Sequence, residues 1–574
     1  MSDGRLTPGG SDDAHTGPSP GPGAGAGAAG GGTAPEGRAA QEGMAAQEST
    51  AAPAARLTVW SDRWTSAALF SGLLLVYAAV YVGAIQIYDT QSMLGVTVNL
   101  VNHGSLTSSG AGFLVNTRYA PYGIADSLLA VPLYALSKVT GNFPGLESMI
   151  SPILTALSAV LIFRIARALR WRASYGLIAA VGYGLLSMAL WYSTQLLSEQ
   201  GVTLCMLVIV LGLVLWRQGA AWAPLWVGLG AAWAIQFRSD SMLTVWIALA
   251  ATPLFVPWRV LWARRPLVLF LGPVAVSLAG LAWYNELRFH RLFVSSYGGD
   301  GGFKTPLWHG LDGLLLSPGR SLFLYSPLTV MGVAGLVVLA WGPGRVRDRP
   351  LCVLGLLLTV PRTLFFAKWD VWDGAAAWGP RFLLPVVAVL SLMIVPVLEA
   401  TDRQALVRVP VRVVTALLAA AGGAVSFLSV RVPLGEWLGL LANPYWRKIY
   451  DISGASATYD FRQKTSPLWG YVELMQRHMA DVSGRWWTSG HGVVGWVLAG
   501  VGGVVLAAAA YGSRRRPVPV RRRGRDGADT PDGVARAGPT APAPADRAAP
   551  APATVGGFFS PPAVRAVRPA VPGP

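Results

Sequence analysis

Long apolar runs recur through most of this 574-residue chain, and they constrain its fold more than any other feature. Each covers about 17–25 residues, enough for a helix to cross roughly 30 Å of hydrocarbon. Only 13% of the residues are charged, and the mean hydropathy is +0.45. The pattern predicts an all-α polytopic membrane protein and excludes an ordinary soluble enzyme. We expect about twelve transmembrane helices, near residues 64–88, 150–169, 174–192, 200–216, 222–237, 241–257, 266–288, 322–342, 351–367, 380–399, 412–430 and 491–511.

The formal net charge of +17 is distributed unevenly along the chain. Arginines gather in alternate short loops, whereas all five lysines fall in the other connections. Because basic loops are retained on the cytoplasmic side, this pattern predicts that both termini are cytoplasmic. We therefore expect a multi-pass plasma-membrane protein with its working face outside. The basic C-terminal tail is expected to lie on anionic lipid rather than on nucleic acid.

Composition also suggests the organisation of the chain. Residues 1–58 and 513–574 are rich in Gly, Ala and Pro, so we expect two disordered cytoplasmic tails. Between them, residues 59–290 form an N-terminal membrane module and residues 291–512 a C-terminal one, which carries a long outer segment at 431–490. The first outer loop contains two amphipathic stretches that predict helices lying along the membrane interface.

Asp89 ends the first apolar run, at the point where the chain enters this loop. One interpretation is structural, because Asp is a good N-cap for a helix starting near Thr90. The other is functional, because ionisable residues at membrane depth are enriched in active sites. The residue alone does not decide between them.

A second candidate lies just before a later apolar run, in residues 367–382. This stretch mixes cations, carboxylates and tryptophans, more than an aromatic belt with solvated charges requires. Indole faces stack on sugars and cations bind phosphate oxygens, so the mixture suits a sugar phosphate. The candidate ligand-contacting residues are Lys368, Trp369, Asp370, Trp372, Asp373 and Arg381.

Other polar residues are expected on the same outer side of the membrane. Some of them allow a structural interpretation, as a tight turn around Arg320, an internal ion pair or an interfacial anchor. The functional interpretation is that they bind or position the substrates. These residues are Arg118, Tyr119, Tyr122, Glu199, Arg238, Asp240, Lys304 and Arg320.

Three segments together resemble a known family. They read RYAPYGIADSLLAVPLYAL, LLLSPGRSLFLYSP and WDVWDGAAAWGPRFLLP. With the acid at the end of the first span, they are similar to the GT-C superfamily of integral membrane glycosyltransferases, which includes protein O-mannosyltransferases and lipid A aminoarabinose transferases. The resemblance covers about residues 60–430 and is strongest to a poorly characterised bacterial branch. It implies that Asp89 is the catalytic base; many relatives carry two adjacent acids there, whereas this chain has one.

The resemblance implies transfer of a sugar from a polyprenyl-phosphate donor to a glycan, lipid or protein acceptor, with inversion at the anomeric carbon. This mechanism requires no cofactor, and the resemblance is compatible with a bound divalent metal as well as with none. A transporter or lipid flippase, and a non-catalytic envelope assembly factor, are the alternatives. Membrane lipids are the other expected partners. Cys205 and Cys352 lie inside apolar runs and are expected to be packing residues.

Overall fold

The computed structural model describes residues 52–81, 87–112, 117–141, 145–292, 302–344, 346–375, 377–431, 437, 461–476 and 491–514. These residues are helices joined by short linkers, with no strand among them. Nearly all of the predicted tails and most of the outer segment 431–490 lie outside the described residues. The all-α prediction is confirmed for the described part of the chain.

By length and composition, seven helical runs among the described residues can cross a membrane. Four further apolar helices are shorter, and α2 packs along the last helix. The chain is a multi-pass membrane protein. The long runs are η1 and α5 (Leu146–Ala168), α8 (Ser198–Arg217), α12 (Arg264–Phe289), α16 (Arg349–Lys368), η4 with α17 and α18 (Arg381–Thr401), α19 (Ala405–Arg431) and α24 (Gly492–Arg514). The shorter ones are α6 (Ala173–Leu185), α9 (Ala223–Phe237), η2 with α10 (Ser239–Phe255) and α15 (Thr329–Trp341).

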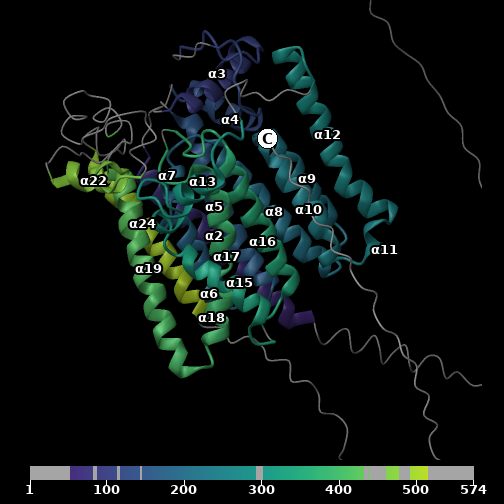
Figure 1. Cartoon of the computed structure of the whole chain (residues 1–574), viewed down its shortest axis with the longest axis vertical. Helices are drawn as coiled ribbons and strands as arrows, with labels where there is room; N and C mark the ends of the chain where they lie inside the picture. Colours follow the sequence, from purple (N-terminus) through teal and green to yellow (C-terminus); the bar gives the residue numbers. More distant parts are fainter. Residues whose placement is uncertain are drawn as a thin grey trace, which may run out of the picture. The chain divides into compact units, whose positions relative to one another are not determined.

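The remaining described elements are three helices near the start of the chain and several shorter helices farther along it (Figure 1). They are α2 (Ala52–Ala79), α3 (Tyr88–His103), α4 (Ala125–Val139), α7 (Ala189–Tyr192), α11 (Trp258–Leu261), α13 (Leu307–Leu315), α14 (Leu322–Tyr325), η6 (Gln463–Thr465) and α22 (Pro467–Gln476).

The first predicted span is misplaced, because α2 ends at Ala79 rather than near residue 88. The helix instead starts earlier and takes in the charged residues that the hydropathy pattern left out. Asp62 can lie inside it because its carboxylate pairs with Arg167 of α5 at 3.1 Å. Small residues bring α2 against α24, since a Cβ on Gly72 would lie 2.8 Å from the Leu506 side chain. Charge pairing and close packing therefore set this boundary.

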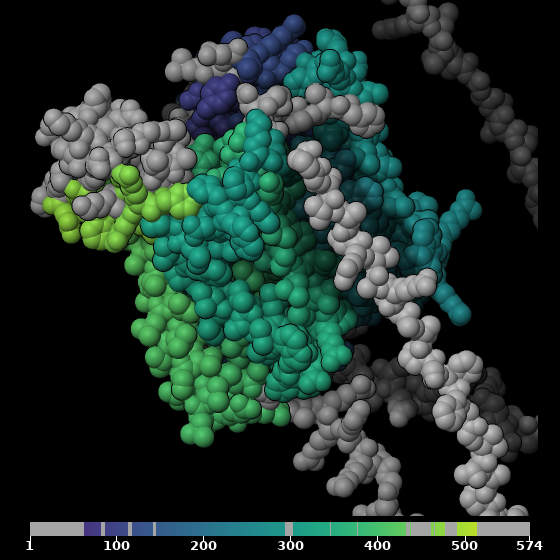
Figure 2. All heavy atoms as spheres, viewed as in Figure 1, coloured from purple at the N-terminus to yellow at the C-terminus, as the bar shows by residue number. Residues whose placement is uncertain are grey.

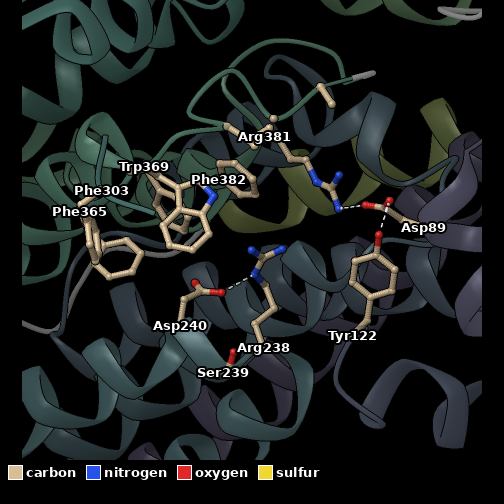
Figure 3. A pocket seen from close by; sticks show the side chains of 14 residues that line it. Asp89, Tyr122, Arg238, Ser239, Asp240, Phe303, Phe365, Trp369, Arg381 and Phe382 are labelled. Atoms are coloured by element: carbon tan, nitrogen blue, oxygen red, sulfur yellow. Dashed lines mark hydrogen bonds and ion pairs between the residues drawn. The ribbon is translucent and has the colours of Figure 1, made fainter. Parts of the chain in front are cut away.

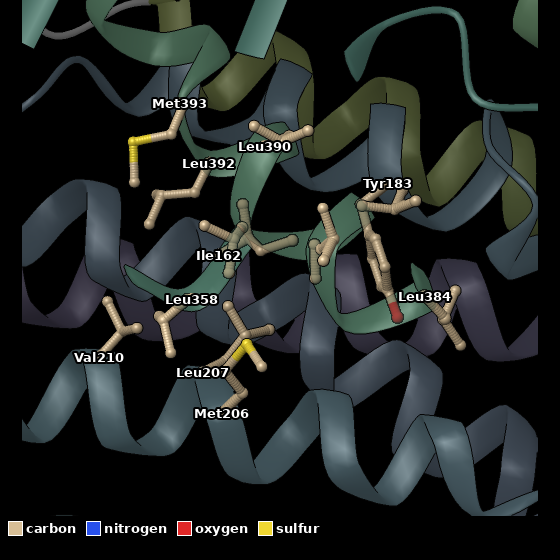
Figure 4. Packing of buried hydrophobic residues seen from close by; sticks show 14 of the residues in the cluster. Ile162, Tyr183, Met206, Leu207, Val210, Leu358, Leu384, Leu390, Leu392 and Met393 are labelled. Carbon is tan, nitrogen blue, oxygen red and sulfur yellow. The ribbon is translucent and has the colours of Figure 1, made fainter. Parts of the chain in front are cut away.

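The helix α17 forms the centre of the bundle, and every residue from Leu384 to Leu392 is buried. It contacts α5, α6, α8, α15 and α16. Figure 4 shows Leu384, Leu390 and Leu392 among apolar side chains that include Leu207 of α8 and Leu358 of α16. A span buried on all sides is held firmly by its neighbours. Arg381, at the start of this helical run, is therefore fixed in position.

The outer surface of the bundle is apolar, as a lipid-facing surface must be. On α19, Leu406 is 92% and Leu417 is 65% exposed. Figure 2 shows a closely packed face formed by the teal and green residues of α13, α16 and α19. Exposed side chains of this kind would be costly in water and are expected in a bilayer.

The two interfacial helices predicted in the first outer loop are present as α3 and α4, and they pack against each other. Thr97 of α3 donates to the Ser127 carbonyl at 2.9 Å, and the Ser127 hydroxyl donates to the Met93 carbonyl at 2.9 Å. Met93 also packs with Leu94 in an apolar cluster that reaches α8 and α9. These contacts hold α3, and with it Asp89, against the membrane spans.

The two ends of the bundle differ in their charges. At the first, called the basic end, short arginine-containing linkers join the spans, and Arg172 pairs with Asp402 while Arg217 pairs with Asp348, both at 2.6 Å. The opposite end, called the pocket end, holds the start of α8, the end of α9, the end of α16 and the start of η4. These arginine-containing linkers, which the charge pattern predicts to be cytoplasmic, thus lie away from the pocket end.

Candidate functional site

A cavity of about 370 Å³ opens at the pocket end. Its walls come from α3, the loop before α4, the α9–η2 junction, the end of α16 and the loop that leads into η4. One side is charged and the other aromatic (Figure 3). The lining residues are Asp89, Tyr122, Arg238, Ser239, Asp240, Phe303, Phe365, Phe366, Trp369, Val371, Gly374, Ala375, Arg381 and Phe382.

Asp89 is joined to the centre of the protein through Arg381. An oxygen of Asp89 accepts from Nη2 of Arg381 at 2.6 Å, and Nε of the same arginine donates to Glu199 at 2.7 Å. The Glu199 side chain is fully buried, and that of Arg381 is 8% exposed. Ion pairs so far from water are barely screened, so each charge depends on its partner.

The same chain of ion pairs continues on the other side of Glu199. Arg238 donates to the shared Glu199 oxygen at 2.8 Å and, through Nε, to Asp240 at 2.7 Å. The second oxygen of Asp240 lies 3.7 Å from Nη2 of Arg362, a residue of α16. This network of ion pairs therefore alternates acid and arginine across five helical segments, α3, η4, α8, η2 and α16, and links the pocket walls.

Asp89 contacts side chains of the pocket wall and does not cap a helix. Helix α3 begins at Tyr88, its N-cap is Ile87, and no side chain caps it. The Tyr122 hydroxyl donates to Asp89 at 2.5 Å. Burial by itself would raise the pKa of the Asp89 carboxyl, but the Arg381 charge and the hydrogen bonds from Tyr122 and Arg381 outweigh it and hold this pKa below its usual value. Asp89 is thus ionised at neutral pH.

The opposite side of the pocket is aromatic. The rings of Trp369 and Phe365 lie parallel, at an angle of 12° and with 6.1 Å between their centroids. Phe303 meets both edge-on, at 5.6 and 5.0 Å. In Figure 3 these three rings gather at one end of the pocket, with Asp240 and Arg238 between them and Asp89. A ligand that spans the pocket would therefore meet an apolar face and a charged one.

The structure brings together Asp89, Tyr122, Arg238, Asp240, Trp369 and Arg381 in the pocket wall, with Glu199 directly behind them. Other residues proposed from the sequence do not line it. Lys304 is exposed and pairs with Asp370 at 3.5 Å, outside the pocket. Arg118 is exposed and lies over the Tyr119 ring at 5.5 Å, and Lys368 is half-buried.

Three further residues predicted from the sequence support the pocket wall from behind. The Arg320 side chain is buried and donates to the backbone carbonyls of Ala377, Gly379 and Ala375, the last at 2.6 Å. Trp372 packs so tightly on Gly313 that a Cβ there would lie 2.2 Å from its ring. Asp373 accepts a hydrogen bond from the Ala375 amide at 3.3 Å. These contacts shape the loop that carries Ala375 into the pocket.

Sequence reasoning missed Arg362 and the phenylalanines of the aromatic side. Arg362 offered a signal, since it is an arginine inside the apolar run of α16, where charge is costly and rarely without a role. Phe303 and Phe365 offered none, because 62 positions separate residue 303 from residue 365 and phenylalanine is ordinary in a membrane span.

The charges of the site balance, because the network of ion pairs contains three carboxylates and three arginines. They are Asp89, Glu199 and Asp240 with Arg238, Arg362 and Arg381. These six side chains together therefore carry no net charge. Both oxygens of Asp89 are already engaged, and the described residues contain no group of three or more His, Cys, Asp or Glu that could hold a metal ion. The residues around Asp89 do not fit a metal.

No family model and no curated protein matches the chain. Among solved structures it is similar to ArnT from Cupriavidus metallidurans in the apo state, with 12% identity and a TM-score of 0.44 over 80% of this chain and 78% of that one. For the same protein bound to undecaprenyl phosphate, the identity is 13% and the TM-score 0.43, over 80% of this chain and 78% of that one. For the Archaeoglobus fulgidus oligosaccharyltransferase, tethered with an acceptor peptide, the identity is 11% and the TM-score 0.40, over 68% of this chain and 59% of that one. At such TM-scores these similarities assign no role to any residue here.

Proposed function

We propose that this protein is a membrane glycosyltransferase of the GT-C type, which moves a sugar from a polyprenyl-phosphate donor to a glycan, lipid or protein acceptor. The observation that carries the proposal is the ionised Asp89, held at 2.6 Å from a buried arginine at the edge of a cavity of about 370 Å³. A base, a cation and room for a sugar are the parts that this reaction needs. The cavity size is within the range of small-molecule sites.

The pocket would lie on the outer side of a bacterial plasma membrane. The support is the separation of the two ends, because arginine-rich linkers are retained in the cytoplasm. A donor with a long apolar tail can lie in the bilayer beside the bundle, with its phosphate at the pocket end. The acceptor would arrive from outside the cell.

Asp89 would act as the general base. Its low pKa keeps it deprotonated, and it would take the proton from an acceptor hydroxyl while the oxygen attacks the anomeric carbon. The new C–O bond forms as the bond between the anomeric carbon and the phosphate oxygen breaks, so the configuration inverts. Tyr122 would hold the carboxylate in the orientation for this transfer, since its hydroxyl donates to the other oxygen.

Arg381 would bind the leaving phosphate. It is engaged by Asp89 and Glu199, and a phosphate entering the pocket would share its guanidinium with Asp89. The arrival of the phosphate thus weakens the hold of Arg381 on Asp89, which raises the pKa of Asp89 and makes it a stronger base. Arg381 then stabilises the charge that grows on the phosphate as the bond breaks.

One observation favours a second candidate, a non-catalytic envelope assembly factor. Every charge in the chain from Asp89 to Arg362 has an opposite partner, as a purely structural network would. Activity distinguishes the two, because a structural network performs no transfer.

The test is a transfer assay with purified protein and radiolabelled polyprenyl phosphates of mannose, glucose, galactose and N-acetylglucosamine, supplied with cell-envelope fractions as acceptor. We expect one donor to give labelled product, and Asp89→Asn to lower the rate by about 10²–10⁴-fold. The matched control is Asp402→Asn, which changes an aspartate that also bonds to a tyrosine and pairs with arginines, at the basic end. Equal rates for wild type and a folded Asp89→Asn would remove Asp89 as the base, and no transfer from any donor would favour the assembly factor.

A further inference from the structure

The Tyr122 hydroxyl, which donates to Asp89 at 2.5 Å, comes from a loop rather than from a helix (Figure 3). Residues 117–124 have no regular secondary structure, so no helical hydrogen bonds fix the position of this ring. A hydrogen bond weakens steeply when its distance or its angle departs from the ideal. The contacts that fix the loop therefore decide how well Tyr122 reaches Asp89.

Arg288, in the last turn of α12, holds this loop by its backbone. Its Nη1 donates to the carbonyls of Ala120 and Tyr122, at 2.7 and 2.9 Å. Hydrogen bonds from a charged donor are stronger than those between neutral groups. One guanidinium nitrogen thus fixes both ends of a three-residue stretch that ends at the tyrosine itself.

The guanidinium group of Arg288 is itself held in place. Its Nη2 donates to Oδ1 of Asn285 at 2.8 Å, and the group lies over the Tyr284 ring, 3.8 Å from the ring centroid. Arg288 is only 7% exposed, although most of α12 faces outward and Trp283 is 61% exposed. A buried charge at the end of a membrane span is costly and is rarely found without a role.

The other side of the loop lies against the end of α9. A Cβ on Gly123 would collide with the carbonyl oxygens of Gln236 and Phe237, so this close approach requires glycine. Nε2 of Gln236 in turn donates to the Ser277 carbonyl of α12 at 2.7 Å, which joins the two helices. The loop is thus held between α9 and α12, and loss of the Arg288 side chain would release one side of it.

Arg288 does not line the cavity, so a ligand bound there would not touch it. Both of its terminal nitrogens are engaged, by the loop carbonyls and by Asn285. The route that these contacts offer to the reaction therefore runs through Tyr122. The hydrogen bond from Tyr122 is one of the contributions that lower the pKa of Asp89, so the route ends at the proposed base.

We propose that Arg288 is a positioning residue, which holds the Tyr122 hydroxyl against Asp89 through the backbone of residues 120–122. This inference rests on the proposed function and adds to it a residue outside the pocket that tunes the base. Without the guanidinium, the loop loses its hold on α12 and the hydrogen bond to Asp89 weakens. The carboxylate then binds a proton more readily.

The test is a double-mutant cycle on the pH profile of kcat/KM, measured with the best donor of the transfer assay. Its members are wild type, Arg288→Met, Tyr122→Phe and the double variant. We expect Arg288→Met to move the acid limb to higher pH by about one unit or less, in the same direction as Tyr122→Phe. In the double variant the limb should lie where Tyr122→Phe alone places it, because the hydroxyl through which Arg288 acts is absent.

Ser277→Ala is the matched control on α12. Its hydroxyl donates to the Ala232 carbonyl of α9 at 2.6 Å, so the change removes a contact between the two helices and leaves those of Arg288 in place. The acid limb of this variant should not move. Arg288→Lys keeps the charge and can bond to one carbonyl. If Arg288→Met fails to fold, Arg288→Lys should give a smaller shift of the same sign, which again disappears in the Tyr122→Phe background.

An unmoved limb in whichever Arg288 variant folds overturns the inference, while transfer by wild type leaves the glycosyltransferase intact. A shift of equal size with and without the Tyr122 hydroxyl also overturns it, because the arginine would then act through its charge alone. An equal shift in Ser277→Ala does the same, since any loosening of α12 would then suffice. Absence of transfer from every donor rejects the proposed function and the role of Arg288 with it.

Discussion

The same three residue types meet at both ends of the bundle, with very different surroundings. At the pocket end, Tyr122 bonds to Asp89 at 2.5 Å and Arg381 pairs with it at 2.6 Å. At the basic end, Tyr175 bonds to Asp402 at 2.6 Å and Arg172 pairs with it at 2.6 Å. The distances hardly differ.

The burial of the arginines separates the two clusters, since the aspartates are similar, with Asp89 17% and Asp402 12% exposed. The Arg172 side chain is 45% exposed, whereas that of Arg381 is 8% exposed and is bonded to a second, fully buried carboxylate. Water and salt screen the exposed cluster and can replace either partner. In the buried cluster only another charged group can do so. The two clusters therefore share their kinds of contact and differ in the desolvation of the arginine and in the cavity beside it.

The largest difference should appear in catalysis when the arginine of each cluster is removed. We expect Arg381→Ala to lower kcat/KM for transfer by about 10²–10³-fold, because the leaving phosphate loses its cation. Arg172→Ala should leave the rate within about twofold of wild type, since an exposed pair contributes little. Initial rates with the best donor measure both, and similar losses in the two variants would remove the distinction between the ends.

Stability should separate the two ends in the same direction. Arg238 is 6% exposed and bonds to two carboxylates, so Arg238→Ala should cost about 3–5 kcal/mol by leaving buried charges unpaired. Arg412 is 55% exposed and pairs with Asp402 at 3.3 Å, so Arg412→Ala should cost less than about 1 kcal/mol. Thermal unfolding in one detergent gives the order of the two variants. A larger loss of stability in Arg412→Ala than in Arg238→Ala would contradict this expectation.

Asp126 differs from Asp89 and Asp402, because this acid of α4 is fully buried and neither of its oxygens has a hydrogen-bond partner. Burial and the nearby Glu199 charge raise its pKa to about 8, against the opposing effect of Arg238. In the unfolded chain its pKa is about 4. Between these values the folded protein holds a proton that the unfolded chain has lost, so Asp126 makes the protein less stable as the pH rises from about 4 to 8.

The variant that tests this effect is Asp126→Asn, which cannot titrate. Its melting temperature relative to wild type should increase by several degrees between pH 5 and pH 8, since ΔΔG grows with each pH unit. Asp402→Asn should show no such gain, because the hydrogen bond from Tyr175 and the charge of Arg172 outweigh burial and keep the pKa of Asp402 below its usual value. Parallel melting curves for wild type and Asp126→Asn would show that Asp126 is not protonated.

The smallest effect is expected from the tyrosines. Tyr122→Phe removes one hydrogen bond that lowers the pKa of Asp89, so the acid limb of kcat/KM should move to higher pH by about one unit or less. The sign follows from the role of Asp89, because a base is lost on protonation and activity falls as the pH falls through its pKa. Tyr175→Phe, the equivalent change at the basic end, should leave the profile unmoved. An unshifted limb in Tyr122→Phe would argue against Asp89 as the titrating base.

Much of the fold followed from the sequence, because the cost of exposing a polar backbone to lipid forces apolar helices of a fixed length. The spans around α8, α12 and α16 were placed within a few residues of their observed bounds. The start of α2 was not, since the helix extends through Asp62, whose partner Arg167 lies over a hundred positions away. A hydropathy pattern contains no information about such a long-range ion pair.

The site was less accessible to sequence reasoning. Asp89 and Arg381 stood out because charge at the rim of a span is costly, and they do lie together. Arg320 stood out for the same reason, yet its donors are used by the backbone carbonyls of a loop. The residue types showed that each charge needs a partner. Only the fold could show whether that partner is another side chain, as for Arg381, or the backbone, as for Arg320.

The most direct test of the proposed site is a structure of the protein bound to polyprenyl phosphate. We expect the phosphate at the pocket end, with an oxygen within about 3 Å of the Arg381 guanidinium and Asp89 still beside it. Phosphate bound instead among the arginines of the basic end, with the contacts of Arg381 unchanged, would contradict the assignment of the pocket as the donor site.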